Sequence, residues 1–482
     1  LRINSLSIYK FYPDSYVPLI IAESIKNYGS VIGPLGAEGM LYPDFFGWTR
    51  PLYPLLILIF SVFTDNRESV AQVISFAAGI LSIPLAYLYV SSALKSKRAG
   101  LLGALLLALS YNHSIWGGFI LSDTTGVFFL LFTLWLLFRN IHQEKELADW
   151  NDLLTGAIFA IALLARYEYT VLIIPFLFLV FNQSPKPLIK TISISASFSV
   201  VLAATYFWLS PFSISSGATT NQIGGFVSSL GALDLSGLWG FIISDSILSL
   251  FFVFGIILLF KGQFIRKLGI FVVISIALLE LLYYQTNPAM QRYFIHLIPF
   301  ILLPASLGFT KITRWLQHHK PSITYAGAGV LCALLLIQSY VTYTGLRKTD
   351  NGLWFTAGYE AEAAKIVSGY LPSDVLLITS FPEPYYLKTN HSTHSIADTS
   401  PFVYISDSLD KKEVVIVEDE GMRQIFPEFT KFLHENMEKY KVNEIQNSTV
   451  YRYGGAVSNV SEPIRLYYVT LTELKRIIKD KS

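Results

Sequence analysis

Six charged residues of this sequence stand inside or directly beside long apolar segments: Asp123, Arg166, Glu168, Asp245, Glu280 and Arg292. An ionisable side chain near the core of a bilayer is costly, so each one needs a charged partner, water or a function. Carboxylates can act as general bases or bind a divalent cation, whereas arginines bind phosphate oxygens through a planar fork of donors. These residue types could therefore bind a phosphate-bearing substrate and accept a proton.

The polar segment that precedes the apolar region adds further groups of the same kinds. Residues 11–16, FYPDSY, place Asp14 ahead of an amphipathic stretch, and residues 38–51, EGMLYPDFFGWTRP, contribute Asp44 and Arg50. We expect the wall of a shared pocket to draw on Asp44, Arg50, His113, Glu168, Asp245 and Glu280. Each of these alone also has a plainer interpretation as a solvated loop carboxylate, a packed histidine or a structurally paired charge.

The composition indicates a membrane protein. Of 482 residues, 52% are hydrophobic and only 15% are charged, with a mean hydropathy of +0.48, whereas soluble proteins carry roughly 25% charge. The net charge of +2 offers no basic surface for nucleic acid. The single cysteine, Cys332, excludes an internal disulfide and a cysteine-built metal site. A soluble enzyme, a disordered protein and a nucleic-acid binder are thus disfavoured.

Ten apolar runs are near the length that spans about 30 Å of hydrocarbon. They are residues 69–91, 98–117, 120–138, 152–167, 169–182, 189–210, 239–260, 267–284, 293–310 and 322–343. The runs 152–167 and 169–182 could be two short helices or one broken helix. Residues 51–63 are too short to span, so we interpret them as a helix at the outer interface, with a distorted span as the alternative.

The cations between these runs predict the orientation, because short loops rich in Lys and Arg stay cytoplasmic. Thirteen cations lie in alternate connections: Lys95, Lys97, Arg98, Arg139, Lys145, Lys186, Lys190, Lys261, Arg266, Lys267, Lys311, Arg314 and Lys320. The opposite short loops hold two, Arg166 and Arg292. The six intramembrane charges therefore all lie near the extracytoplasmic face of the membrane, which favours one polar cavity there. Since the chain would begin outside without a signal-peptide pattern, we expect a further helix upstream of Leu1.

Three domains follow from this pattern: a first extracytoplasmic loop with juxtamembrane helices (1–68), a transmembrane helical domain (69–343) and an extracytoplasmic α/β domain (344–482). The last holds 16 Lys and Arg and 19 Asp and Glu. It alternates helix-like segments (361–371 and 426–440) with strand-like ones (374–380, 412–419, 449–454 and 465–471), which predicts a partly parallel sheet. An acceptor-binding role and a merely stabilising role are both open for this domain.

Several short motifs in this order resemble a known superfamily. They are YPDSYVPLIIAESIKNYGS in the first loop, TRPLYP, LSD at 121–123, LLARYEY at 163–169 and QRYFIHLIPFILLPASLG at 291–308. The order is similar to that of GT-C glycosyltransferases, in the branch of dolichyl-phosphate-mannose protein mannosyltransferases and the bacterial lipid A aminoarabinose transferase. The resemblance covers about residues 8–310 and implies a mainly α, polytopic transmembrane helical bundle of the GT-C type.

What the resemblance implies is transfer of a sugar from a polyprenyl-phosphate donor to an acceptor on the extracytoplasmic face, with inversion. Asp14 then corresponds to the catalytic base and Asp123 to the second acidic residue, while Arg166, Arg292 and Tyr293 correspond to donor phosphate-binding positions. The pair Asp14 and Ser15 departs from the paired acids of many members, and Arg50 stands where a histidine is common. Some relatives use a divalent metal, which Asp14 and Asp123 could bind; the sequence leaves this open.

The implied partners are the lipid-linked sugar donor and an acceptor that is a glycan, a lipid or a protein. The implied location is the plasma membrane, or the endoplasmic reticulum of a eukaryotic host, with several membrane passes. The main alternative is a transporter or channel with a charged outer vestibule. Transporters place their sites near the midplane, whereas these charges gather toward one face. A receptor or scaffold without chemistry would leave that gathering unexplained.

Overall fold

In the computed structural model of this chain, the residues described are 15–28, 50–64, 66–141, 150–209, 242–261, 263–286, 291–318, 321–348, 363–372, 375–380, 382–389, 391–395, 413–419, 422–423, 426–445, 450–453, 456–459 and 463–470. The chain divides into two compact units. The first consists of Leu1–Ser7, Arg50–Leu56 and Ser69–Leu346. The second consists of Ile8–Thr49, Ile57–Glu68 and Arg347–Ser482.

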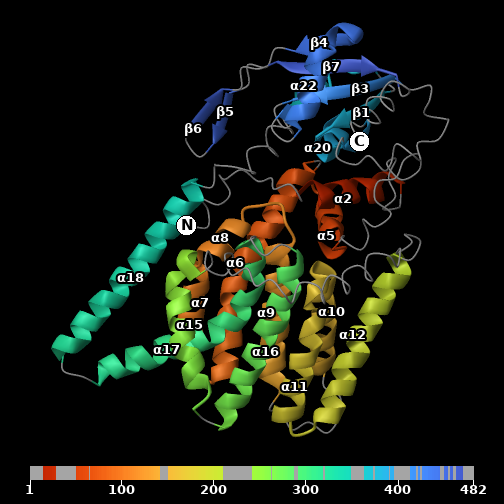
Figure 1. The fold of residues 1–482 in the computed structure, drawn as a ribbon. Coiled ribbons are helices and arrows are strands. Elements are labelled where there is room, and N and C mark those ends of the chain that lie inside the picture. Colours follow the sequence, from red (N-terminus) through yellow and green to blue (C-terminus); the bar gives the residue numbers. More distant parts are fainter. Residues whose placement is uncertain are drawn as a thin grey trace. The chain divides into compact units, whose positions relative to one another are not determined.

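The first unit is a bundle of helices (Figure 1). They are α6 (Arg67–Leu94), α7 (Lys97–Leu109), α8 (Tyr111–Trp116), α9 (Asp123–Asn140), α10 (Trp150–Ala165), α11 (Ile173–Gln183), α12 (Pro187–Leu209), α15 (Ser246–Leu259), α16 (Gln263–Thr286), α17 (Ile298–Gln317) and α18 (Pro321–Lys348). Short 3₁₀ helices lead into two of them, η2 (Tyr167–Leu172) into α11 and η4 (Gln291–Leu297) into α17. The predicted mainly α bundle is confirmed.

The helices have the character of membrane spans. Four stretches in the described residues are long and apolar enough to cross a bilayer: Arg67–Leu94, Pro187–Thr205, Arg292–Gln317 and Tyr325–Thr342. Their outward surfaces include exposed apolar side chains, such as Leu81, Val200 and Leu336, which form the surface that lipid chains cover. The chain is therefore a multi-pass membrane protein. Each of the ten predicted runs contains helix, while the number of spans stays a prediction.

Two of the predicted runs are broken by single residues. The run 98–117 is not one helix, because Ser110 leaves the helical conformation (φ −61°, ψ 124°) and its hydroxyl accepts the N–H of His113, which starts α8. In the run 152–167, Arg166 is extended (φ −151°, ψ 96°) and ends α10 at Ala165, so this run and the run 169–182 belong to two separate helices. Both breaks put polar residues at helix ends.

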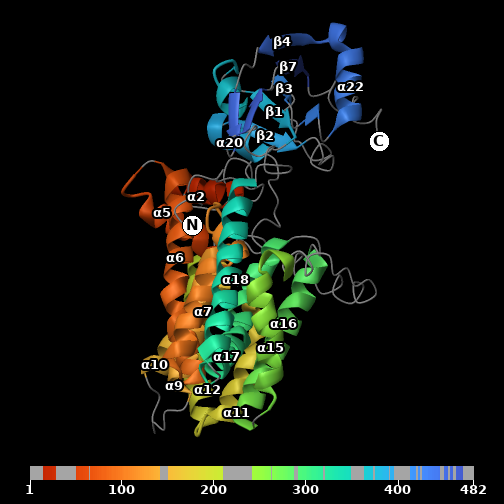
Figure 2. The same cartoon turned by 90° about the vertical axis from the view of Figure 1, so that its left-hand side faces the viewer.

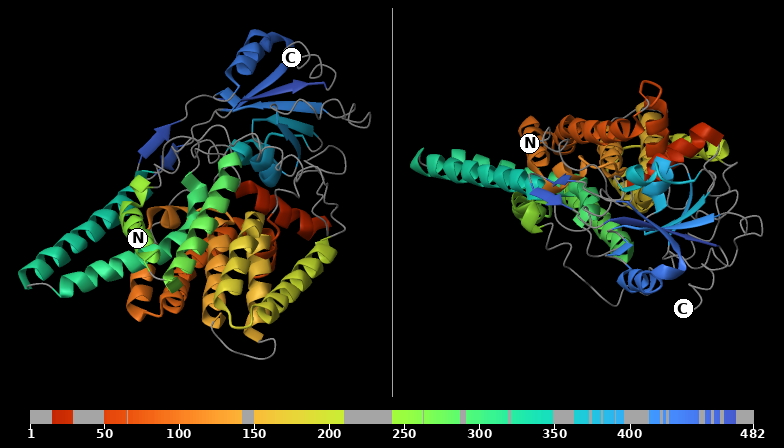
Figure 3. Two further views of the ribbon diagram at one scale, coloured as in Figure 1. Left: turned by 60° about the horizontal axis from the view of Figure 1, so that its bottom comes forward. Right: turned by 90° about the horizontal axis from the view of Figure 1, so that it is seen from above.

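Small residues allow the helices to approach closely. α10 lies between α9 and α12 (Figure 3), and α15 packs along α17 (Figure 2). At the α15–α17 contact, a Cβ on Gly255 would collide with the carbonyl oxygen of Pro304, so only glycine permits this backbone contact. Membrane helices use small residues in this way because lipid provides no hydrophobic drive for association. The close contact fixes α17, whose preceding η4 carries Arg292.

The second unit holds a five-stranded sheet in the order β2-β1-β3-β7-β4. Its strands are β1 (Val375–Thr379), β2 (Ser392–Ser395), β3 (Glu413–Glu418), β4 (Lys441–Ile445) and β7 (Ile464–Val469). β1 pairs with β2 and β3 in parallel, whereas β7 pairs with β3 and β4 antiparallel, so the partly parallel sheet is confirmed. The remaining described elements of this unit include α2 (Tyr16–Tyr28), α20 (Pro382–Thr389), α22 (Pro427–Glu435) and the hairpin of β5 (Val450–Tyr453) with β6 (Ala456–Asn459). α5 (Leu52–Phe60) begins in the first unit and ends in the second.

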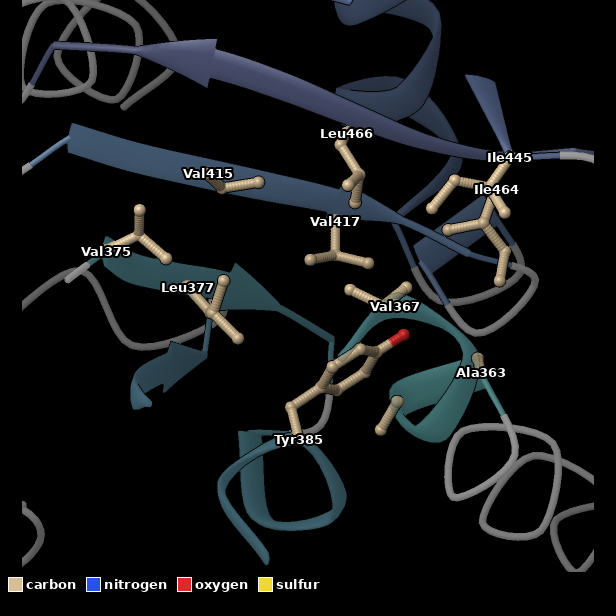
Figure 4. Packing of buried hydrophobic residues seen from close by; sticks show 11 residues of the cluster. Ala363, Val367, Val375, Leu377, Tyr385, Val415, Val417, Ile445, Ile464 and Leu466 are labelled. Carbon is tan, nitrogen blue, oxygen red and sulfur yellow. The ribbon is translucent and has the colours of Figure 1, made fainter. Parts of the chain in front are cut away.

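Both faces of this sheet are covered. Figure 4 shows one face, where Leu377 of β1 and Val417 of β3 pack with Tyr385 of α20. On the other face, Ile416 packs with Leu433 of α22. Burial on both faces explains why the sequences of β1 and β3 are almost continuously apolar and do not alternate between apolar and polar residues.

A buried carboxylate network closes the carboxyl end of β3. Glu418 accepts hydrogen bonds from the Tyr467 hydroxyl (2.7 Å) and from Nη1 of Arg423 (2.9 Å). Its neighbour Asp419 accepts one from the Tyr385 hydroxyl (2.6 Å). The two carboxylates thus connect β3 to β7 on one side and to α20 on the other.

Candidate active site

Asp123 is the centre of a buried cluster of charges in the helical unit. It is the first residue of α9 and is fully buried. Its partners Arg166 and Arg292 are also buried, with at most 1% of either side chain exposed. Nε of Arg292 lies 3.2 Å from Oδ1 and 3.1 Å from Oδ2 of Asp123, and Nη2 lies 3.1 Å from Oδ2. This side-on arrangement is the strong, charge-assisted form of an arginine–carboxylate pair.

A second arginine joins Asp123 to a second carboxylate. Nη2 of Arg166 lies 3.4 Å from Oδ1 of Asp123 and 3.5 Å from Oε1 of Glu168. Glu168 in turn accepts a 2.7 Å hydrogen bond from Nη2 of Arg50. The cluster of Arg50, Asp123, Arg166, Glu168 and Arg292 therefore has three positive groups and two negative ones. An excess of positive charge in a buried place favours binding of an anion.

Tyr293 forms the half-buried edge of this cluster. Its ring centroid lies 5.9 Å from Cζ of Arg166 and 5.7 Å from Cζ of Arg292, both within the range of cation–π attraction. Tyr293 is partly exposed, unlike the two arginines. The tyrosine ring thus lies next to both guanidinium groups where the cluster meets its surroundings.

The local sequence explains how these side chains reach one place. α9, η2 and η4 all begin at the same end of the bundle, because the helices between them alternate in direction (Figure 1). Arg166 passes directly over Gly126 of α9, where a Cβ would lie 2.6 Å from Cγ of Arg166. The start of α9 is held by Ser75, whose hydroxyl donates to the carbonyl of Leu121 (2.9 Å). Gly126 therefore leaves room for Arg166, and Ser75 holds the start of the helix that carries Asp123.

Two residues that the sequence analysis did not name complete the cluster. Nε2 of His296 lies 3.2 Å from Oδ1 of Asp123, and Nδ1 of His296 lies 2.7 Å from the hydroxyl of Tyr169. All three side chains are fully buried. The available signal was a histidine four residues after Arg292 inside an otherwise apolar run.

Asp245 lies in a separate network. Its carboxylate accepts the backbone N–H of Tyr111 (2.7 Å) and of Asn112 (3.2 Å), the Asn112 side-chain amide (2.7 Å) and the Ser110 hydroxyl (3.1 Å). The two backbone N–H groups are the first donors of α8, so the structure gives Asp245 the role of a helix cap. His113 is buried in that same helix, and its backbone N–H donates to Ser110. Both residues thus belong to the break between α7 and α8.

The remaining candidates are placed as follows. Glu280 is half-buried in α16 and, within the described part of the chain, takes no part in the ion pairs around Asp123. Asp14 and Asp44 lie outside the described residues. The structure therefore brings together Arg50, Asp123, Arg166, Glu168, Arg292 and Tyr293 of the predicted set.

Among the described residues, the donor set around Asp123 does not fit a metal ion, and Asp14 lies outside those residues. Within the described ranges, no three His, Cys, Asp or Glu side chains gather closely enough to hold one. Both oxygens of Asp123 already face arginine nitrogens, whose positive charge opposes a divalent cation.

Comparison with known proteins supports one superfamily. Residues 49–210 match the family described as dolichyl-phosphate-mannose-protein mannosyltransferase. This match contains Arg50, Asp123, Arg166 and Glu168. No curated protein sequence matches the chain.

Solved structures share the fold over nearly the whole chain. The ArnT protein of Cupriavidus metallidurans in its apo state has 9% identity and a TM-score of 0.61, with 98% of this chain and 96% of that one covered. The same protein bound to undecaprenyl phosphate has 10% identity and a TM-score of 0.57, with 96% and 95% covered. The oligosaccharyltransferase of Archaeoglobus fulgidus, tethered with an acceptor peptide, has 12% identity and a TM-score of 0.53, with 93% and 70% covered. The match and the shared fold confirm the resemblance of this chain to the GT-C superfamily, on its mannosyltransferase and ArnT-like side.

Proposed function

We propose that this protein is a membrane glycosyltransferase that moves a sugar from a polyprenyl-phosphate donor to an acceptor hydroxyl on the extracytoplasmic face, with inversion. The observation that carries the proposal is the pair of fully buried arginines, Arg166 and Arg292, around Asp123. A lipid carrier can bring its phosphate only to headgroup depth while its isoprenoid chain stays among apolar helices. A buried cationic cluster where membrane helices begin is suited to such a phosphate.

Support comes from the positive excess of the cluster and from the relatives. The ArnT structure holds undecaprenyl phosphate, a lipid phosphate of the same chemical class as the proposed donor. In this chain, Arg166, Arg292 and Tyr293 are the proposed phosphate-binding residues. The arginines would stabilise the phosphate oxygens as the leaving group gains charge, when such preorganised donors contribute most.

The proposed reaction is a single displacement at the anomeric carbon. Asp14 takes the proton of the acceptor hydroxyl as its oxygen bonds to the anomeric carbon. The bond from that carbon to the phosphate oxygen breaks, and polyprenyl phosphate leaves with the electron pair. Asp123 keeps the two arginines in place throughout. Attack opposite the leaving group gives inversion.

The extracytoplasmic location rests on the cations of the connecting loops. Asp123 and Arg292 lie near the ends where α9 and α17 begin, whereas Arg139 and Arg314 lie near the ends where these helices finish. Because short cationic connections stay cytoplasmic, the cluster belongs on the opposite side.

Membrane vesicles of both orientations test the proposal. Inverted and right-side-out vesicles that contain the protein are given radiolabelled polyprenyl-phosphate sugars, and transfer to acceptors is measured. We expect transfer with extracytoplasmic access only, and none with Asp14→Asn. Transfer unchanged in Asp14→Asn and Asp14→Ala would remove the proposed base. Movement of labelled solute across the membrane without transfer would instead support a transporter.

A further inference from the structure

A hydrogen-bonded pair, Tyr169 and His296, adjoins the arginine cluster at Asp123 and has no part in the reaction proposed above. The Tyr169 hydroxyl and His296 Nδ1 are 2.7 Å apart, and His296 Nε2 is 3.2 Å from Oδ1 of Asp123. The two rings meet edge to face, with centroids 5.6 Å apart and planes at 72°. The three side chains come from η2, η4 and α9, so the contact joins three separate elements.

The partners fix the direction of these hydrogen bonds. An ionised carboxylate only accepts, so Nε2 of His296 carries the proton that faces Asp123. With the ring neutral, Nδ1 is an acceptor and the Tyr169 hydroxyl donates to it. The chain therefore runs from the hydroxyl through the imidazole to the carboxylate in one direction. This order holds the imidazole in a single tautomer.

Each member of the pair is tied to one of the two buried arginines. The backbone N–H of Tyr169 donates to the carbonyl of Arg166 at 3.1 Å, one 3₁₀ turn away. His296 follows Arg292 by four residues in η4. A hydrogen bond between Tyr169 and His296 thus connects the short segment that carries Arg166 to the one that carries Arg292.

We propose that Tyr169 and His296 are positioning residues that set the separation of the guanidinium groups of Arg166 and Arg292. This inference rests on the proposed function, in which those two arginines bind the donor phosphate. The pair acts through Asp123 and through the two 3₁₀ segments, and it does not touch the lipid phosphate. Loss of the pair should therefore weaken recognition of the phosphate group while recognition of the isoprenoid chain stays the same.

Two lipids that differ only in the phosphate test this inference. The full chain in nanodiscs is titrated with undecaprenyl phosphate and with undecaprenol, and ligand-induced thermal stabilisation gives an apparent affinity for each. The variants are Tyr169→Phe, His296→Phe and His296→Gln. The matched control is Tyr89→Phe, because Tyr89 is equally buried and its hydroxyl has no hydrogen-bond partner within the described part of the helical unit.

We expect Tyr169→Phe and His296→Phe to bind undecaprenyl phosphate about tenfold more weakly and undecaprenol as before, since a lost buried hydrogen bond has roughly this effect. His296→Gln carries both a donor and an acceptor, so it should recover part of the phosphate affinity. If His296→Phe does not fold, Tyr169→Phe carries the test.

Two results separate the failure of this inference from the failure of the function. Unchanged phosphate preference in Tyr169→Phe and both His296 variants, with reduced preference in Arg292→Lys, overturns the positioning role alone. No preference for the phosphate lipid in the wild type overturns the proposed donor site itself.

Discussion

The guanidinium of Arg292 contacts the carboxylate of Asp123 side-on, through Nε and Nη2, although 169 residues separate the two in sequence. Both groups are buried, so each depends on the other for its charge to be tolerated. In the proposed enzyme this pair is also the floor of the phosphate site. Under that proposal, the geometry of one arginine serves both stability and binding.

Arg292→Lys should retain the charge but lose this geometry, because an ammonium group cannot make the planar two-nitrogen contact. We expect affinity for undecaprenyl phosphate to fall about tenfold, with the protein still folded. Thermal stabilisation by the lipid measures this. Arg314→Lys is the control, since Arg314 is exposed on α17. An affinity equal to wild type in Arg292→Lys would count against a role in phosphate binding.

The sequence could reveal the charged residues of the site because charge is rare in apolar runs. Asp123, Arg166 and Arg292 stand out for this reason, and the cation pattern placed them at one depth. Their pairing was beyond reach, since no local pattern joins Arg50 to Glu168 across 118 residues. The fold was predicted for a similar reason: long apolar runs and short alternating strands each leave a strong local signal.

The sequence does not distinguish helix caps from site residues. It groups Asp245 with the site because of its depth, but the contacts of Asp245 depend on the break at Ser110, which apolarity alone does not show. Tyr169 and His296 cannot be recognised from the sequence, because tyrosine and histidine without a formal charge do not stand out in apolar runs. Whether a buried polar group caps a helix or holds a substrate site depends on partners that are distant in sequence.

Tyr293 offers a test of the aromatic contact with both arginines. Tyr293→Phe keeps the ring, so it should bind undecaprenyl phosphate nearly as the wild type does. Tyr293→Ala removes a ring that lies 5.7 Å and 5.9 Å from the two guanidinium carbons. We expect a loss of affinity of roughly fivefold, which corresponds to about 1 kcal/mol of cation–π attraction. Isothermal titration on nanodiscs measures it, and equal losses in both variants would instead assign the effect to the hydroxyl.

The stability of the α/β unit should depend on pH through Glu418. Burial opposes its ionisation, but hydrogen bonds from Tyr467 and Arg423 and the charge of His434 outweigh burial and hold the pKa of Glu418 below its ordinary value of 4.5. The unfolded chain therefore takes up the proton first as the pH falls. The stabilisation is fully present above about pH 4.5 and is lost as the pH falls through the lower pKa of the folded state.

Glu418→Gln should reveal that contribution. We expect it to destabilise the unit by roughly 1–3 kcal/mol at neutral pH and by less as the pH falls below 4.5. Hydrogen exchange in β3 and β7 of the full chain, compared with wild type at each pH, measures the difference. Glu444→Gln is the matched control, because Arg465 forms ion pairs with both Glu418 and Glu444, and Glu444 is 48% exposed. A destabilisation that stays constant down to pH 3 would contradict the ionised state of Glu418.

Neighbouring Asp419 should affect the pH dependence of stability in the opposite direction. Burial is the largest influence on it and raises its pKa despite hydrogen bonds from Tyr385 and the backbone of Met422. The folded state therefore holds the proton of Asp419 more tightly than the unfolded state does, and this group favours folding more as the pH falls through its raised pKa. Asp419→Asn should accordingly make the stability of the unit less sensitive to a rise in pH above 3.8, the ordinary pKa of aspartate. Hydrogen exchange at β1 and β3 follows this, and an unchanged pH profile would assign the carboxyl a purely hydrogen-bonding role.

Gly126 gives the strictest test of how Arg166 is positioned. A Cβ at this position would lie 2.6 Å from Cγ of Arg166 and 3.2 Å from the Tyr169 hydroxyl, so Gly126→Ala must displace both side chains. Overpacking of this kind costs about 1–3 kcal/mol. We expect a lower midpoint of thermal unfolding and a loss of affinity for undecaprenyl phosphate of about tenfold.

Gly329→Ala is the control for that change, since a Cβ there would meet nothing within 4 Å and alanine favours a helix more than glycine does. It should leave lipid binding unchanged and stability equal or slightly higher. Gly126→Ala with wild-type affinity for the phosphate lipid would mean that Arg166 can move without cost to binding. In that case Arg292 alone would hold the donor phosphate, and the proposed two-arginine site would have to be reduced to one.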